Sequence, residues 1–141
     1  MAKRIRKHFK NILPIKKPIL KEALYTQTSN FTLNTAQLDR ISFSVLRNNK
    51  RELRKIENIS YEINIEGCWE WIVRYDDHGG VGSLHRHIRI SLKDDSNVES
   101  TIGIKKYKDK GHELTWVCKN IQRDYLNIRT KFLRNSKIDL Y

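Results

Sequence analysis

The sequence predicts an α+β fold, namely a four-stranded antiparallel sheet with a long C-terminal helix and an N-terminal helical and basic segment packed on one face. Hydrophobic and polar residues alternate through much of residues 59–107, which is typical of strands that bury one face. Residues 114–132 instead place their hydrophobic residues along one helical stripe. Strands followed by a helix that covers one sheet face form a two-layer arrangement. We expect all 141 residues to form a single domain.

The N-terminal third has the least distinct pattern. Residues 1–18 predict a basic arm that two prolines interrupt, residues 19–25 allow one or two helical turns, and residues 26–35 predict a polar loop. The globular core is expected over residues 36–135. At its start, hydrophobic residues recur with helical spacing between Leu38 and Leu46, whereas residues 41–45 also alternate as in a strand. Both interpretations of residues 36–54 remain open.

Four strands are predicted in the middle of the chain, over residues 59–66, 69–76, 84–93 and 100–107. Gly67 suits the left-handed position of a short hairpin loop between the first two strands. In the second strand, Trp69 and Trp71 alternate with polar residues in phase with Val73 and Tyr75, so we expect both tryptophans in the core. A glycine-rich loop and a turn at residues 94–97 connect the other strands.

The most regular helical pattern covers residues 113–134. Its hydrophobic residues fall on one stripe, which consists of Leu114, Val117, Cys118, Ile121, Tyr125, Ile128 and Phe132. Basic side chains lie mostly off this stripe. We expect the stripe to pack against one face of the sheet at Trp71, Val73, Ile88 and Ile90.

The net charge of +12 is concentrated in two segments. Residues 1–22 carry eight basic groups against one acidic group, residues 105–137 carry ten against three, and residues 51–104 carry seven against ten. Clustered positive charge is typical of proteins that bind a phosphate backbone, although an acidic protein partner or a well-solvated surface would also suit it. We expect RNA as the partner, contacted by Lys3, Arg4, Arg6, Lys7, Arg86, Arg89, Lys105, Lys106, Lys119 and Arg123.

Strand pairing predicts which polar side chains meet. Paired positions in an antiparallel hairpin sum to a constant and point to the same face. A loop over residues 77–84 gives a sum near 161, which places Asp76 opposite His85 and Arg74 opposite His87. We expect these four residues and Arg89 on the solvent-exposed face that the helix leaves open, with Asp77 and His78 in the adjoining loop.

This group of residues suits cleavage of a phosphodiester. Histidine titrates near neutrality and can move protons to and from ribose oxygens, arginine can hold the phosphate, and an aspartate can orient a histidine. Without a metal or other cofactor, the catalytic residues would be Arg74, Asp76, His78, His85 and His87. Two alternatives remain open. Asp76 and the three histidines could hold zinc or manganese, or the cluster could be purely structural.

Residues 73–78 (Val-Arg-Tyr-Asp-Asp-His) and 85–87 (His-Arg-His) resemble the signature of TumE-type toxins from type II toxin–antitoxin modules. The resemblance implies a compact fold similar to the RelE-like ribonucleases, an endoribonuclease acting on mRNA, tRNA or ribosome-associated RNA, and a cognate antitoxin as partner. Residue by residue, it implicates Arg74, Asp76, His78, His85 and His87. Asp77, where an asparagine is common, and the long basic arm depart from the pattern. A nucleic-acid-binding protein without catalysis and a metal-dependent nuclease are the alternatives.

The chain is expected to be cytoplasmic. Its basic N-terminus lacks the apolar stretch of a secretion signal, and no apolar run approaches the length that crosses a bilayer. The two cysteines form no metal-binding pattern, so two reduced thiols are expected.

Overall fold

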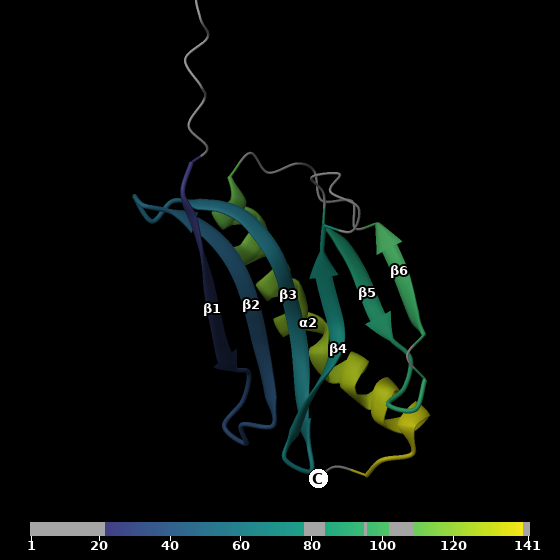
Figure 1. The fold of residues 1–141 in the computed structure, drawn as a ribbon. Coiled ribbons are helices and arrows are strands. Elements are labelled where there is room, and N and C mark those ends of the chain that lie inside the picture. The colour runs from purple at the N-terminus through teal and green to yellow at the C-terminus, as the bar shows by residue number, and fades with distance from the viewer. Residues whose placement is uncertain (1–21, 78–83, 95, 102–108, 140–141) are drawn as a thin grey trace, which may run out of the picture.

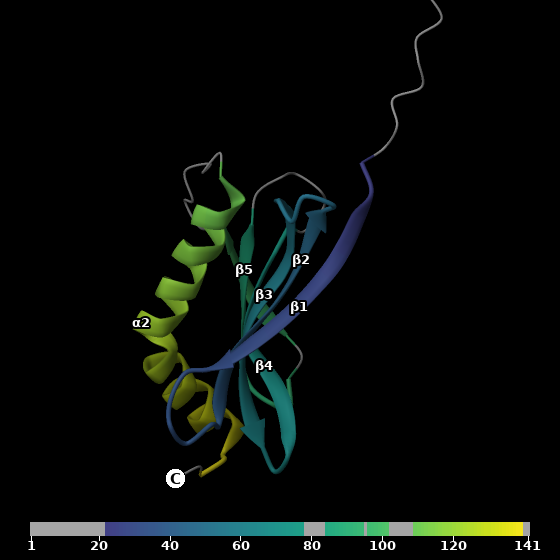
Figure 2. The same cartoon turned by 90° about the vertical axis from the view of Figure 1, so that its left-hand side faces the viewer.

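Six strands form one antiparallel sheet in the computed structural model, which describes residues 22–77, 84–94, 96–101 and 109–139. Each strand pairs with the next along the chain, and α2 covers one face (Figures 1 and 2). The strands are β1 (Leu24–Thr32), β2 (Asp39–Asn48), β3 (Leu53–Ile65), β4 (Cys68–Asp76), β5 (His85–Arg89) and β6 (Asn97–Thr101), and the helix α2 is Lys110–Ser136. The α+β class, the antiparallel sheet and the long C-terminal helix are therefore confirmed.

The sheet begins earlier in the chain than predicted. β1 occupies most of the expected loop at residues 26–35, and β2 shows that the strand interpretation of residues 41–45 was the right one. Eight of the nine residues of β1 are exposed, so the strand lacks the alternation that marks one buried face. Within residues 22–54 there is no helix, and the expected basic arm lies outside the described residues.

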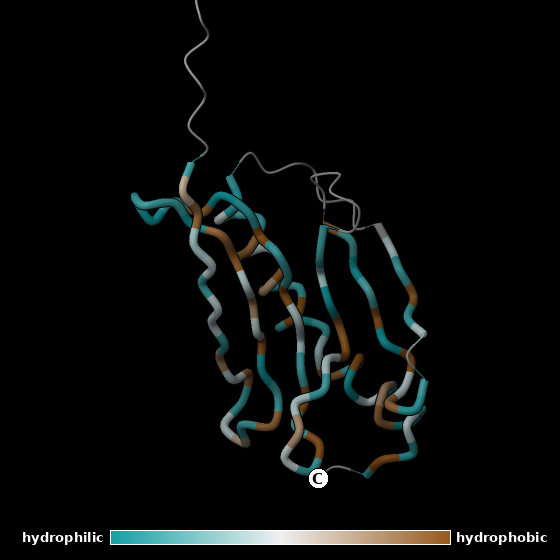
Figure 3. Tube along the Cα trace, in the orientation of Figure 1, coloured by the Kyte–Doolittle hydropathy of each residue, from teal (hydrophilic) through white to brown (hydrophobic). Residues whose placement is uncertain are grey.

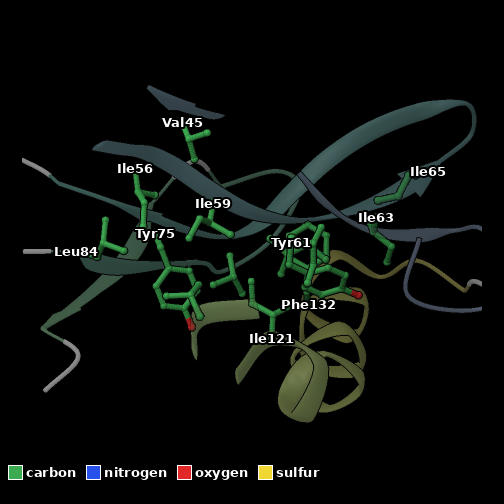
Figure 4. Packing of buried hydrophobic residues seen from close by; sticks show 14 of the residues in the cluster. Val45, Ile56, Ile59, Tyr61, Ile63, Ile65, Tyr75, Leu84, Ile121 and Phe132 are labelled. Atoms are coloured by element: carbon green, nitrogen blue, oxygen red, sulfur yellow. The ribbon is translucent and has the colours of Figure 1, made fainter. Parts of the chain in front are cut away.

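The core lies between the sheet and α2. Ile59, Tyr61 and Ile63 of β3 and Val73 of β4 are almost completely buried, and Val117, Ile121 and Phe132 of the helix pack against them (Figure 4). The rings of Tyr61 and Tyr125 meet edge to face with their centroids 5.6 Å apart. Hydrophobic residues alternate with hydrophilic ones along β2 and β3, whereas β1 is mainly pale or hydrophilic (Figure 3).

A buried polar network ties the helix to β2 and β3. Asp39 is 2% exposed; it accepts hydrogen bonds from the Tyr61 hydroxyl and from the Asn34 amide, and its carboxylate lies 3.4 Å from Nε of Arg129 in α2. Burial, followed by the hydrogen bond to Asp39, raises the pKa of the Tyr61 phenol well above its ordinary value.

A β-bulge in β4 places Trp69 and Trp71 on a different face of the sheet from the one that was expected. The register of β3 against β4 shifts between Tyr61 and Glu62, so Ile72 is an extra residue and Trp71 pairs with Glu62. The extra residue reverses the phase of the strand. Ile72 and Val73 are both buried, while Trp69 and Trp71 are half-buried and leave the core. The prediction that the tryptophans belong to the core with Val73 was therefore wrong.

The helix extends a few residues beyond each end of the predicted range. Its expected contacts with Trp71 and Ile90 differ from the prediction. Asp109 caps its N-terminus by accepting a hydrogen bond from the amide of Gly111, and Lys137 ends it in the left-handed conformation. Val73 and Ile88 pack in or against the core as expected. Ile90 follows the end of β5 and is 38% exposed, and it contacts the helix through a hydrogen bond from the Asn135 side-chain amide to its backbone oxygen.

Candidate active site

The predicted register of β4 and β5 is confirmed. Arg74 pairs with His87 and Asp76 pairs with His85, so paired residue numbers sum to 161. Val73 pairs with Tyr61, whose ring contacts the helix, and this places Val73 and Tyr75 on the helix side of the sheet. Their neighbours Arg74 and Asp76, with both paired histidines, therefore lie on the opposite face, which we call the open face.

A chain of polar contacts runs across β4, β5 and β6 on the open face. Nε of Arg74 donates to Oδ2 of Asp76 at 2.9 Å, and Oδ1 of the same carboxylate lies 3.2 Å from Nε2 of His87. Nδ1 of His87 lies 3.0 Å from the amide oxygen of Asn97. A carboxylate only accepts, so Nε2 of His87 carries a proton. Nδ1 can then donate to the Asn97 oxygen in the charged ring or accept from the rotated amide in the neutral ring.

His87 differs from the expectation in its exposure. It is 5% exposed, although the sequence predicted a solvent-exposed position. The reason is its central place in the cluster, with strand partners on both sides and polar contacts at both ring nitrogens. A reacting phosphate cannot reach either nitrogen without displacing a contact, so this geometry suits a positioning or charge-holding role.

His85 is the more accessible histidine, and its orienting partner was not predicted. Nδ1 of His85 lies 3.0 Å from Oε1 of Glu99, and the side chain of His85 is 19% exposed. Since the Glu99 carboxylate can only accept, Nδ1 carries the proton and Nε2 is the basic nitrogen of the neutral ring. Among the described residues, Nε2 has no hydrogen-bonding partner. This arrangement is that of an oriented general base.

Arg74 provides a cationic group next to these histidines. Its guanidinium carbon lies 4.9 Å from the centre of the Trp71 ring, which the bulge in β4 has moved to the open face. Asp76 binds Nε, and the two terminal nitrogens have no hydrogen-bonding partner among the described residues. The Arg74 side chain is 39% exposed, so these nitrogens can contact a phosphate from solvent.

Arg89 and Arg86, two of the predicted RNA contacts, form contacts within the protein instead. Arg89 is 8% exposed; it pairs with Glu70 at 2.9 Å and donates to the backbone oxygens of Trp71 and Leu92. These contacts connect β4 to the segment after β5, beyond the last residue pair between the two strands. Arg86 pairs with Tyr75 on the helix side and donates to the Ser100 hydroxyl. Neither geometry favours the predicted contact with RNA.

The remaining candidate RNA contacts divide into two groups. Lys119 and Arg123 are exposed on α2, where Arg123 forms two 2.9 Å hydrogen bonds with Asp124 and lowers the pKa of that carboxyl group. The helix lies on the face opposite to His85, so these cations and the histidines are on opposite sides of the sheet (Figure 2). The other candidate RNA contacts lie outside the described residues, namely Lys3, Arg4, Arg6, Lys7, Lys105 and Lys106. The candidate catalytic residue His78 also lies outside them.

A groove with mostly apolar walls is also on the helix side. It has a volume of about 540 Å³ between the β5–β6 end of the sheet and the C-terminal half of α2, with Ile88, Val98, Ile128 and Phe132 among its apolar walls and Lys131 beside them. It lies away from the imidazoles and has no part in the polar cluster. In the described part of the chain, histidine, cysteine and carboxylate side chains do not gather in threes at metal-binding geometry.

Comparison of the chain with protein-family models, with curated proteins and with solved structures finds no significant match to any of them. In the residues that the structure describes, no helix is both long enough and apolar enough to cross a lipid bilayer.

Proposed function

We propose that this chain is a cytoplasmic endoribonuclease that cleaves RNA by acid–base catalysis without a metal, as the toxin of a toxin–antitoxin module. The observation that supports this proposal most directly is the Glu99–His85 pair, which presents a basic ring nitrogen on the same open face as Arg74. Orienting carboxylate, histidine and arginine are the groups that transesterification of RNA requires.

In the proposed reaction, Nε2 of His85 removes the proton from a ribose 2′-hydroxyl, and the 2′-oxygen attacks the adjacent phosphorus. The bond from phosphorus to the 5′-oxygen breaks, and that oxygen takes a proton from a second acid. The products are a 2′,3′-cyclic phosphate and a free 5′-hydroxyl. The terminal nitrogens of Arg74 stabilise the negative charge that develops on the phosphate.

The second acid is one of the two remaining candidate histidines. His87 would have to release Asp76 or Asn97 to donate a proton, so its geometry favours holding Asp76 and Arg74 in place. The proposal therefore assigns the leaving-group proton to His78, which follows Asp77 in the chain. A His78→Ala variant that loses cleavage but retains the fold would support this assignment.

Affinity for RNA must come largely from outside the described cluster. The described cluster contains one arginine and two carboxylates, so it is not strongly cationic. The segment at residues 1–22, which contains the basic arm, carries a net charge of +7 and precedes β1. Twenty residues can extend to about 65 Å, whereas β1 and β5 are about 19 Å apart at four strand spacings. We propose that this arm holds the RNA backbone over the cluster.

The proposal also includes an antitoxin as protein partner. A chain with net charge +12 attracts an acidic partner, and the groove beside Lys131 offers apolar walls on the face away from His85. The observation that would test this part is the neighbouring reading frame, which should encode a small acidic or DNA-binding protein that forms a complex with the chain.

The deciding experiment measures cleavage of a labelled RNA in excess chelator. We expect a cyclic-phosphate end, a loss of about 10²–10⁴-fold in rate for His85→Ala, and a smaller loss for Glu99→Gln. His112→Ala is the matched control, because His112 is exposed at the start of α2. Activity that needs a divalent metal would indicate a metal-dependent nuclease. Full RNA affinity with cleavage absent even from the unmodified chain would indicate a binding protein instead.

A further inference from the structure

Within the part of the chain that the structure describes, β1 is an unusually unprotected edge strand. It is one of the two edges of the sheet in the described residues, and it lies at the end opposite to β6 (Figure 1). Leu24–Thr32 contains no charged residue, no proline and no glycine, although 31% of the whole chain is charged. Its pairing with β2 runs through nine residue pairs without a bulge. Natural edge strands usually carry charges, prolines or bulges that prevent pairing with another strand.

The other edge differs in its length and in its charge. β6 has five residues, includes Glu99, and follows a turn that contains Asp94. A short edge with a charge is protected in the ordinary way. The contrast singles out β1 as the edge that is suited to pair.

The sequence of β1 is complementary to itself. If two copies pair antiparallel about a two-fold axis at Thr28, all nine residues overlap, and residue numbers in each pair sum to 56. Tyr25 then lies opposite Phe31 on both sides of the axis, and the other pairs are polar or mixed. Tyr25 and Phe31 are 43% and 38% exposed in one chain and lie on the same face of the strand. Cross-strand aromatic pairs stabilise antiparallel sheets.

We propose that β1 is a homodimer interface, through which two copies of this chain form one continuous antiparallel sheet. A nine-residue antiparallel pair can form about eight to ten backbone hydrogen bonds, which is within the usual number for a protein interface. The two-fold axis is perpendicular to the sheet, so both helices lie on one side and both open faces on the other. His85 belongs to the β4–β6 end of the sheet, so the interface leaves both candidate active sites accessible.

Charge gives this interface a distinctive salt dependence. Each copy carries +12, and Arg47 beside Gln27 is among the cations close to β1, while the strand itself offers no ion pair. Salt screens the repulsion between the copies and leaves the hydrogen bonds and aromatic pairs in place. Dimerisation should therefore strengthen with salt, which is the opposite of the behaviour expected for RNA binding.

Sedimentation equilibrium over a range of protein and salt concentrations tests the proposal. We expect a dimer that tightens between about 50 and 500 mM salt, where the Debye length falls to a few ångströms. Thr28→Lys places two like charges opposite each other at the axis and should weaken association about fivefold. Thr115→Lys adds the same charge on an exposed part of α2 and should leave association within twofold of the parent at high salt.

A cross-linking experiment tests the register without relying on affinity. In a Cys68→Ser background, Thr28→Cys should form a disulfide-linked dimer under mild oxidation, because paired Cα atoms lie within disulfide range. Val98→Cys, which is exposed on β6, should not. A chain that stays monomeric at hundreds of micromolar, a dimer that dissociates with salt, or cross-linking through β6 alone would each overturn the proposal. Cleavage activity unchanged in Thr28→Lys would leave the proposed function intact.

Discussion

Arg89→Ala separates a structural arginine from an RNA contact. The side chain is 8% exposed, pairs with Glu70 at 2.9 Å, and donates to the backbone oxygens of Leu92 at 3.2 Å and Trp71 at 3.4 Å. Its guanidinium also lies 5.6 Å from the Trp71 ring centre and 5.9 Å from that of Phe132. The variant removes all of these contacts at the point where β4 and β5 separate.

The magnitude follows from these contacts. A hydrogen bond from a charged group contributes about 1.5–3 kcal/mol, and removing one member of a buried pair costs about 3–5 kcal/mol. The carboxylate of Glu70 is 32% exposed and regains water, and the contact to Trp71 is long, so the lower end applies. We expect Arg89→Ala to lower the free energy of unfolding by about 3 kcal/mol.

Urea denaturation monitored by tryptophan fluorescence and by circular dichroism measures this change. Lys119→Ala, on the exposed face of α2, is the control and should stay within about 0.5 kcal/mol of the parent. In a double-mutant cycle, Glu70→Gln should have less effect once Arg89 is absent. A stability loss below about 1 kcal/mol together with a clear loss of RNA affinity would refute the structural assignment and restore the predicted RNA contact.

Three further predictions use other parts of the molecule. The pKa of the Tyr61 phenol is raised in the folded state, so the stability that this phenol contributes is complete below the pKa of an unfolded tyrosine, about 10. Above that pH the contribution is lost at up to about 1.4 kcal/mol per pH unit. Tyr61→Phe should therefore make the urea-denaturation curves at pH 8 and pH 11 differ less than they do in the parent. Asp109→Ala removes the helix cap and should cost about 1 kcal/mol in the same assay, whereas an unchanged midpoint would mean that the cap contributes nothing. RNA affinity should fall steeply with salt, with a log–log slope of several units; deletion of residues 1–21 should reduce that slope more than Lys119→Ala, and equal slopes would exclude the arm as the main contact.

The sequence predicted the β4–β5 register because two simple constraints determine it. Core-facing residues are odd-numbered at Val73 and Tyr75 and even-numbered at Ile88, so paired numbers must have an odd sum. The length of the connecting loop then leaves few choices. The same reasoning placed Arg74, Asp76, His85 and His87 on the open face, where the structure has them.

Features without a local pattern were not predictable. The bulge at Ile72 reverses the phase of β4 over one residue, and no glycine or proline marks it, so Trp71 was assigned to the wrong face. Glu99 was missed because β6 was expected to start at residue 100, whereas it starts at Asn97. Residues 94–97 are all polar, and a strand that begins inside a polar cluster has no boundary in the sequence. β1 was taken for a loop because its side chains are exposed on both faces.

The two faces of the sheet differ in the contacts that their side chains make. Arg74, His87 and Glu99 occupy adjacent cross-strand positions, so the hydrogen-bond ladder itself sets their spacing. The helix supports those strands from the other side without entering the cluster (Figure 2). Substitutions of core residues on the helix side, and of the buried Arg89, should therefore act mainly on folding. Those of the more exposed Arg74 and His85 on the open face should act mainly on the proposed cleavage. An RNA strand held at His85 could reach the cations of α2 only by passing around an edge of the sheet. Of the two edges, β6 is the nearer one to His85.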